Sequence, residues 1–130
     1  MLSGEVREME TVTLTLKNQP VLFLEADNIS PDVFAGKKAA DIAALHAYEG
    51  REQITLGKYF EVAGNAGATA ADTKIVVKGD LTRVKYIGMK MSAGEVVVEN
   101  STDMYTGAWM QGGKLLVKGS TTAFTGIGMK

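Results

Sequence analysis

Residues 105–117, YTGAWMQGGKLLV, and residues 124–130, FTGIGMK, repeat one pattern: an aromatic residue, Thr, Gly and, three positions later, Met. A third and looser copy, YIGMKM, occupies residues 86–91. A spacing of nineteen residues aligns three columns, which are Tyr86, Tyr105 and Phe124, then Gly88, Gly107 and Gly126, then Met91, Met110 and Met129. Gly94 aligns with Gly113 at the same spacing. Agreement at several separated positions indicates an internal repeat.

Short apolar runs recur with the repeat at residues 75–77, 96–98 and 115–117. Their β-branched residues, bounded by glycine, are typical of strands. Nineteen residues at about 3.3 Å each trace roughly 60 Å of chain, enough for one turn of a coil whose strands stack about 4.8 Å apart. We therefore predict a mainly β fold with rungs of ~19 residues, a rung being one turn of the coil. The alternative is an antiparallel meander, with hairpin turns at Gly79-Asp80 and Gly112-Gly113.

The coil predicts a place for each column. The aromatic residues stack as a ladder, the methionines fill the interior, and the glycines take corners where φ is positive. Val96 is expected to pair in parallel with Leu115, and Tyr105 to lie within about 5 Å of Phe124. Trp109 shares its column with a lysine and a glycine, a combination that does not suit a packed interior, so we expect it to point outward as a partner contact.

Upstream of the repeat the pattern predicts N-terminal strands and one short helix. Residues 1–10 are expected to form a flexible extension, and residues 11–63 to hold strands at 11–17, 21–26 and 53–64. A helix is expected at about 31–47, with Ser30 as its cap and Pro31 at its first position. Residues 64–130 are assigned to the rungs. The whole chain, 1–130, is interpreted as a single domain.

Composition excludes several classes of function. A net charge of −1 and a pI near 5.8 do not favour nucleic-acid binding. No apolar run reaches the roughly 20 residues of a membrane span, and residues 1–10 lack the apolar centre of a signal peptide, so we expect a cytoplasmic protein with no membrane contact. The sequence has no cysteine and a single histidine, His46. No catalytic, metal-binding or cofactor-binding residue is therefore predicted.

Two stretches, YIGMKMSAGEVVVEN (86–100) and YTGAWMQGGKLLVKG (105–119), closely resemble the GXGXG repeat region of the C subunit of formylmethanofuran dehydrogenase. They are more distantly similar to the C-terminal domain of the large subunit of glutamate synthase. Residues 22–45 and 56–80 also resemble the N-terminal part of the same C subunit. The resemblance implies a right-handed parallel β-helix.

The resemblance also implies a function. The chain is expected to be a non-catalytic scaffold subunit of the complex that reductively fixes CO₂ onto methanofuran in methanogenesis, an oxidoreductase. The tungsten or molybdenum pterin and the iron-sulfur clusters are then expected in partner subunits. Because an open rung at residues 126–130 would expose strand edges, a homo-oligomer is expected in isolation. Two alternatives remain, which are the C subunit of a formyltransferase/hydrolase complex and a stand-alone β-helical assembly module.

Overall fold

The computed structural model describes residues 9–20, 22–81, 83–88, 90–99 and 110–118. The fold is mainly β, as predicted. The strands are β1 Glu10–Leu16, β2 Leu24–Glu25, β3 His46–Glu49, β4 Glu52–Thr55, β5 Phe60–Ala63, β6 Thr73–Lys78, β7 Val84–Lys85, β8 Glu95–Val98 and β9 Lys114–Val117. The helices are α1 Pro31–Phe34, α2 Ala39–Ala43, α3 Leu56–Tyr59 and the 3₁₀ turn η1 Ala70–Asp72.

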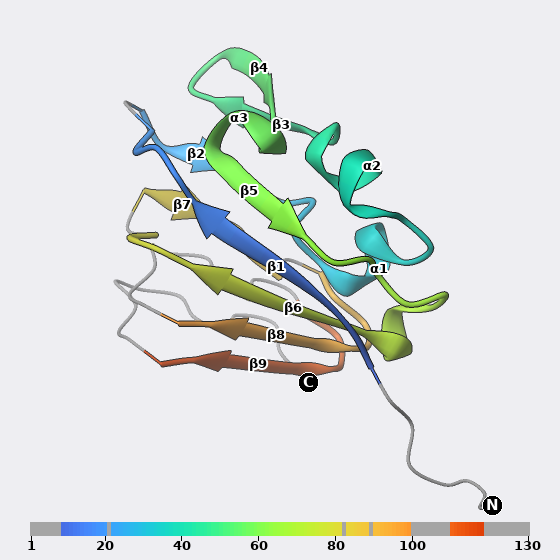
Figure 1. Cartoon of the computed structure of the whole chain (residues 1–130). Coiled ribbons are helices and arrows are strands. Elements are labelled where there is room, and N and C mark those ends of the chain that lie inside the picture. Colours follow the sequence, from blue (N-terminus) through green and yellow to red (C-terminus); the bar gives the residue numbers. More distant parts are fainter. Residues whose placement is uncertain (1–8, 21, 82, 89, 100–109, 119–130) are drawn as a thin grey trace, which may run out of the picture.

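The strands form two mixed sheets. The larger has the order β5-β1-β6-β8-β9, and the smaller has the order β4-β3-β2-β7. In the larger sheet β1, β6, β8 and β9 pair in parallel, whereas β5 is antiparallel to β1. Figure 1 shows these five strands across the front of the view, with β2 and β7 behind them.

The predicted parallel pairing is confirmed for the described strands of the repeat. Val96 of β8 is the register partner of Leu115 of β9, and Ile75 of β6 is the partner of Val96. These strands are parallel, so the antiparallel meander is wrong here, and neither predicted hairpin turn joins a hairpin. The predicted contact between Tyr105 and Phe124 lies outside the described residues.

The parallel stack begins earlier in the chain than the repeat indicates. Strand β1 pairs in parallel with β6, with Val12 opposite Ile75, and β2 pairs in parallel with β7, with Leu24 opposite Val84. The amide of Gly88 continues this stacking by donating a hydrogen bond of 2.8 Å to the Ile29 carbonyl. In both sheets, therefore, a strand before residue 64 pairs in parallel with a strand after it.

The single helix predicted at 31–47 is wrong. The side chain of Ser30 does cap α1 by accepting from the Val33 amide at 3.2 Å, and Pro31 is at its start. The helix ends after four residues, and Gly36 follows with a φ of +77° that an α-helix does not use. After α2 the chain enters β3, whose side chains alternate between exposed and buried as in a half-buried strand. β3 pairs with β4 in an antiparallel hairpin.

The continuous strand predicted at 53–64 is also wrong, because the helical turn α3 separates β4 from β5. At this turn the chain passes from the smaller sheet, which contains β4, to the larger sheet, which contains β5. The buried residues of the turn, Leu56 and Tyr59, belong to the core. β5 then lies along the edge of β1, with Leu14 opposite Val62. An antiparallel strand therefore covers that edge.

The core lies between the two sheets. Alternate residues of the larger sheet point inward and are fully buried or nearly so; these are Val12, Leu14, Ile75, Val77, Val96 and Val98. Leu24 and Val84 of the smaller sheet are equally buried, and these side chains belong to one apolar cluster. Because register fixes which side chains meet, β1, β6 and β8 each add two residues to the core, and β2 and β7 add one each.

Candidate functional site: the stacked turns

The turn before β8 lies directly against the turn before β9. The amide of Gln111 donates to the Met91 carbonyl at 2.8 Å, and the amide of Lys114 donates to the Gly94 carbonyl at 2.9 Å. The backbone of one turn thus satisfies the polar groups of the next. The turns before β8 and β9 therefore stack with about the same nineteen-residue offset as the strands that follow them.

Gly94 and Gly113 are the positions where this stacking demands glycine. Their φ angles are +85° and +81°. A Cβ on Gly94 would meet the carbonyl oxygen of Ala70 and would lie 2.7 Å from the Thr73 carbonyl oxygen. A Cβ on Gly113 would lie 2.8 Å from the Gly94 carbonyl oxygen. Both glycines are therefore fixed by backbone conformation and by close backbone approach together.

The other described members of the repeat lie as follows. Met91 and Met110 are buried, with exposed fractions of 0% and 1%. Gly88 has a φ of +74°, and Tyr86, which is half-buried, has the unusual value of +69° for a residue with a side chain. The remaining predicted residues lie outside the described part of the chain; these are Tyr105, Gly107, Trp109, Phe124, Gly126 and Met129.

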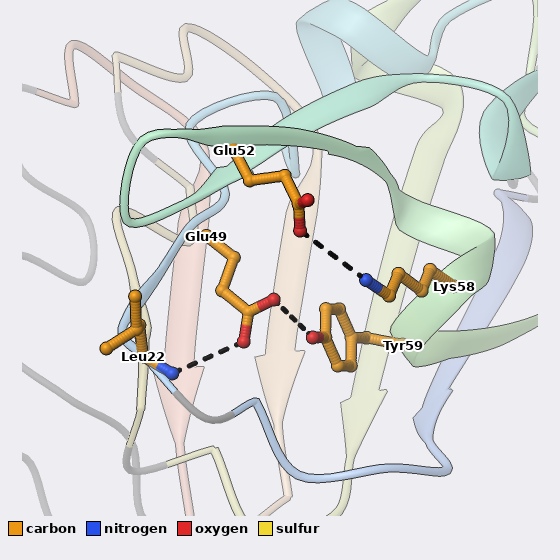
Figure 2. Close-up of polar contacts among 5 residues, drawn as sticks. All are labelled: Leu22, Glu49, Glu52, Lys58 and Tyr59. Atoms are coloured by element: carbon orange, nitrogen blue, oxygen red, sulfur yellow. Dashed lines mark hydrogen bonds and ion pairs between the residues drawn. The ribbon is translucent and has the colours of Figure 1, made fainter.

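A buried carboxylate that sequence analysis missed, Glu49, joins the end of β3 to the segment before β2 and to α3. Figure 2 shows Glu49 between the backbone of Leu22 and the ring of Tyr59. One carboxylate oxygen accepts a hydrogen bond from the Tyr59 hydroxyl, and the other accepts one from the Leu22 amide at 3.2 Å. Glu49 is only 7% exposed, and its burial at the end of β3 follows from the two-residue alternation of that strand. The residue types of β3, His-Ala-Tyr-Glu, do not alternate between polar and apolar, so the sequence offered no local signal for a buried Glu49.

The same contact changes the acidity of Tyr59. The hydrogen bond to Glu49 raises the pKa of the phenol from 10.0 to about 12, and burial adds to the effect. Beside it, the Nζ of Lys58 lies 3.8 Å from a carboxylate oxygen of Glu52, as Figure 2 shows. Both partners of this ion pair are at least half exposed, so it contributes little stability. The cluster is therefore suited to holding the β3-β4 hairpin and α3 against the segment before β2.

The chemistry of the described residues is limited. Among them, no group of three or more His, Asp or Glu side chains is placed to hold a metal ion, and His46 lies exposed on β3. None of the described helices is long and apolar enough to cross a membrane. What the described residues provide is a mainly β fold of two mixed sheets, in which the parallel strands β8 and β9 are preceded by turns that lie in close contact.

The comparisons with known proteins show which β proteins this chain resembles. The chain is 45% identical over 97 residues to the C subunit of the tungsten-containing formylmethanofuran dehydrogenase 2 of Methanothermobacter thermautotrophicus, a match covering 75% of this chain and 36% of that protein. It is 46% identical over 98 residues to the C subunit of the molybdenum-containing enzyme 1 of Methanosarcina barkeri, covering 75% and 33%. The chain is thus a relative of the C subunits of formylmethanofuran dehydrogenases. It spans about a third of the length of these curated relatives.

A solved structure shares the fold. A chain in the crystal structure of the formyltransferase/hydrolase complex from Methylorubrum extorquens, in complex with methylofuran, aligns with a TM-score of 0.60. The two chains are 23% identical, and the alignment covers 84% of this chain and 47% of that chain. At this identity the likeness concerns the fold. No protein-family model matches the chain.

Proposed function

We propose that the chain is a non-catalytic assembly subunit of a formylmethanofuran dehydrogenase complex. The observation that carries this is the identity of 43–46% to four relatives, each named as the C subunit of such an enzyme. Tungsten-containing and molybdenum-containing enzymes match about equally well, so the proposal covers both. The cytoplasmic location predicted above is part of the proposal.

The scaffold role in this proposal rests on a right-handed parallel β-helix. Parallel pairing in both sheets and the stacked glycine turns support it. The connection from β6 to β8 passes through β7 of the other sheet, and crossovers between parallel strands are right-handed in about 98% of cases. Such a rigid stack presents flat outer faces to neighbouring subunits.

In this proposal the redox groups belong to other subunits. The tungsten or molybdenum pterin and the iron-sulfur clusters need ligands such as thiolates, and this sequence contains no cysteine. We expect the purified chain to retain no stoichiometric tungsten, molybdenum or iron after dialysis, and neither to reduce CO₂ nor to oxidise a formyl group. One equivalent of a redox metal in elemental analysis would contradict the proposal that the redox groups belong to other subunits.

Coexpression tests the complex itself. The tagged chain is expressed with the other subunits of a formylmethanofuran dehydrogenase and, separately, with those of a formyltransferase/hydrolase. We expect it to copurify in fixed ratio with the first set. Copurification with the second set alone would favour the alternative enzyme, and copurification with neither would indicate a stand-alone module. Sedimentation of the isolated chain tests the further expectation of a homo-oligomer.

A further inference from the structure

The outer face of the larger sheet carries an apolar stripe. Val76, Val97 and Leu116 are register partners on β6, β8 and β9, and they point away from the core because their strand neighbours point into it. Leu116 is 54% exposed, and the two valines are half-buried. In Figure 1 no described helix lies over the front of these three strands. A contiguous apolar patch rimmed by polar residues is a feature of interaction surfaces.

Two rows of charged residues border the stripe. Lys74, Glu95 and Lys114 are register partners along one side. Along the other side Lys78, Glu99 and Lys118 follow the last paired residues of the same strands, and Lys118 lies 3.8 Å from Glu99. Each row reads Lys-Glu-Lys, so four lysines and two glutamates give this surface a net charge of +2, on a chain whose net charge is −1.

The order of these charges disfavours a second copy centred on the same three strands. Two copies that met face to face with their strands aligned, around a two-fold axis through the stripe, would place lysine over lysine and glutamate over glutamate in both rows. Like charges in direct opposition repel. A surface with apolar side chains between carboxylates would instead match both the stripe and the excess of lysine.

We propose that this surface, made of the apolar stripe and its two charged rows, docks a different polypeptide whose contact face carries apolar side chains flanked by carboxylates. The inference rests on the proposed function as an assembly subunit, and it names the face through which assembly occurs. The stripe supplies the buried centre of the interface and the lysines its charged rim. The lysines also make association sensitive to salt.

Two variants with matched controls test the surface. The probe is the remaining subunits of a formylmethanofuran dehydrogenase, purified together without this chain, and the readout is the dissociation constant by calorimetry. Leu116→Ser removes the exposed apolar side chain, and Leu22→Ser changes a leucine of equal exposure, 55%, elsewhere on the surface. Lys114→Glu reverses a charge in one row, and Lys38→Glu reverses an exposed lysine beside α2.

We expect Leu116→Ser and Lys114→Glu each to weaken binding about ten-fold or more, as the loss of an interface contact does, while the two controls remain within about two-fold. The effect of Lys114→Glu is expected to shrink as salt is raised. If the unaltered chain does not bind the probe, the proposed function fails. If it binds and the two variants bind equally well, this surface is not the interface. If sedimentation shows that the variants abolish a dimer of the chain itself, the occupant is a second copy and the proposal is wrong.

Discussion

Replacing Gly94 by alanine tests the stacked turns directly, because Gly36 offers a matched control. Both glycines have positive φ, +85° and +77°. An added Cβ at Gly94 would meet the Ala70 carbonyl oxygen and lie 2.7 Å from the Pro31 Cβ, whereas at Gly36 nothing lies within 4 Å. The two substitutions therefore share the conformational cost and differ in the steric one.

The expected magnitudes follow from that difference. A left-handed conformation costs alanine about 1–2 kcal/mol, so Gly36→Ala should lower the free energy of unfolding by that amount. Gly94→Ala adds a clash with the neighbouring turn, and overpacking costs about 1–3 kcal/mol more. Urea denaturation at fixed pH measures both, with unchanged m-values as the check that both variants unfold in the same way. Equal destabilisation by the two substitutions would refute the close stacking of the turn at Gly94 on Ala70 and Thr73.

Three further predictions concern the core and the buried carboxylate. Met91→Ala should cost about 2–5 kcal/mol in the free energy of unfolding as a buried large-to-small change, while Leu116→Ala stays within about 0.5 kcal/mol; similar losses would contradict the assigned faces. Tyr59→Phe should cost about 1.5–3 kcal/mol because it removes the donor to a charged carboxylate, and Tyr48→Phe, at a residue 47% exposed, serves as its control. The folded-state pKa of Tyr59 is raised from 10.0 to about 12, so its contribution to stability is complete below pH 10 and is lost between pH 10 and 12. Tyr59→Phe should lack that alkaline step, and a variant that kept it would assign the step to another group.

The sequence predicted the parallel pairing of β8 with β9 and the recurrence of the apolar runs on β6, β8 and β9. Identity at a fixed spacing is informative because stacked units place equivalent residues in equivalent surroundings, as at Gly94 and Gly113. The repeat did not reveal that β1 joins the parallel strands, because β1 pairs with β6 in register but differs from it in sequence. Threonines of β1 lie opposite Lys74 and Val76 on the outer face. Outer positions accept many side chains, so only the alternation of Val12 and Leu14 remained as a signal.

The segment between residues 31 and 63 was predicted poorly for a different reason. Its elements are four or five residues long, and a helix of that length is not stable on its own propensity. Tertiary contacts decide its conformation. The hydrogen bonds of Glu49 to Leu22 and Tyr59 fix the hairpin and α3, but they join residues 27 and 10 positions apart. Prediction from local patterns does not register such contacts.

The two outermost described strands of the larger sheet differ in pairing: one is antiparallel to its neighbour and the other is parallel. At one edge β5 runs antiparallel to β1, and the turn α3 that leads into it comes from the smaller sheet. Among the described strands, β9 lies at the other edge and repeats the parallel register of β8, residue for residue, from Glu95 opposite Lys114 to Val98 opposite Val117. A strand that runs in the direction of β9 would pair with β9 in parallel, whereas beside β5 it would have to pair in the antiparallel manner. Strand β5 thus covers the outer edge of β1, the first parallel strand, and the proposed docking surface runs across β6, β8 and β9 at the other end of the sheet.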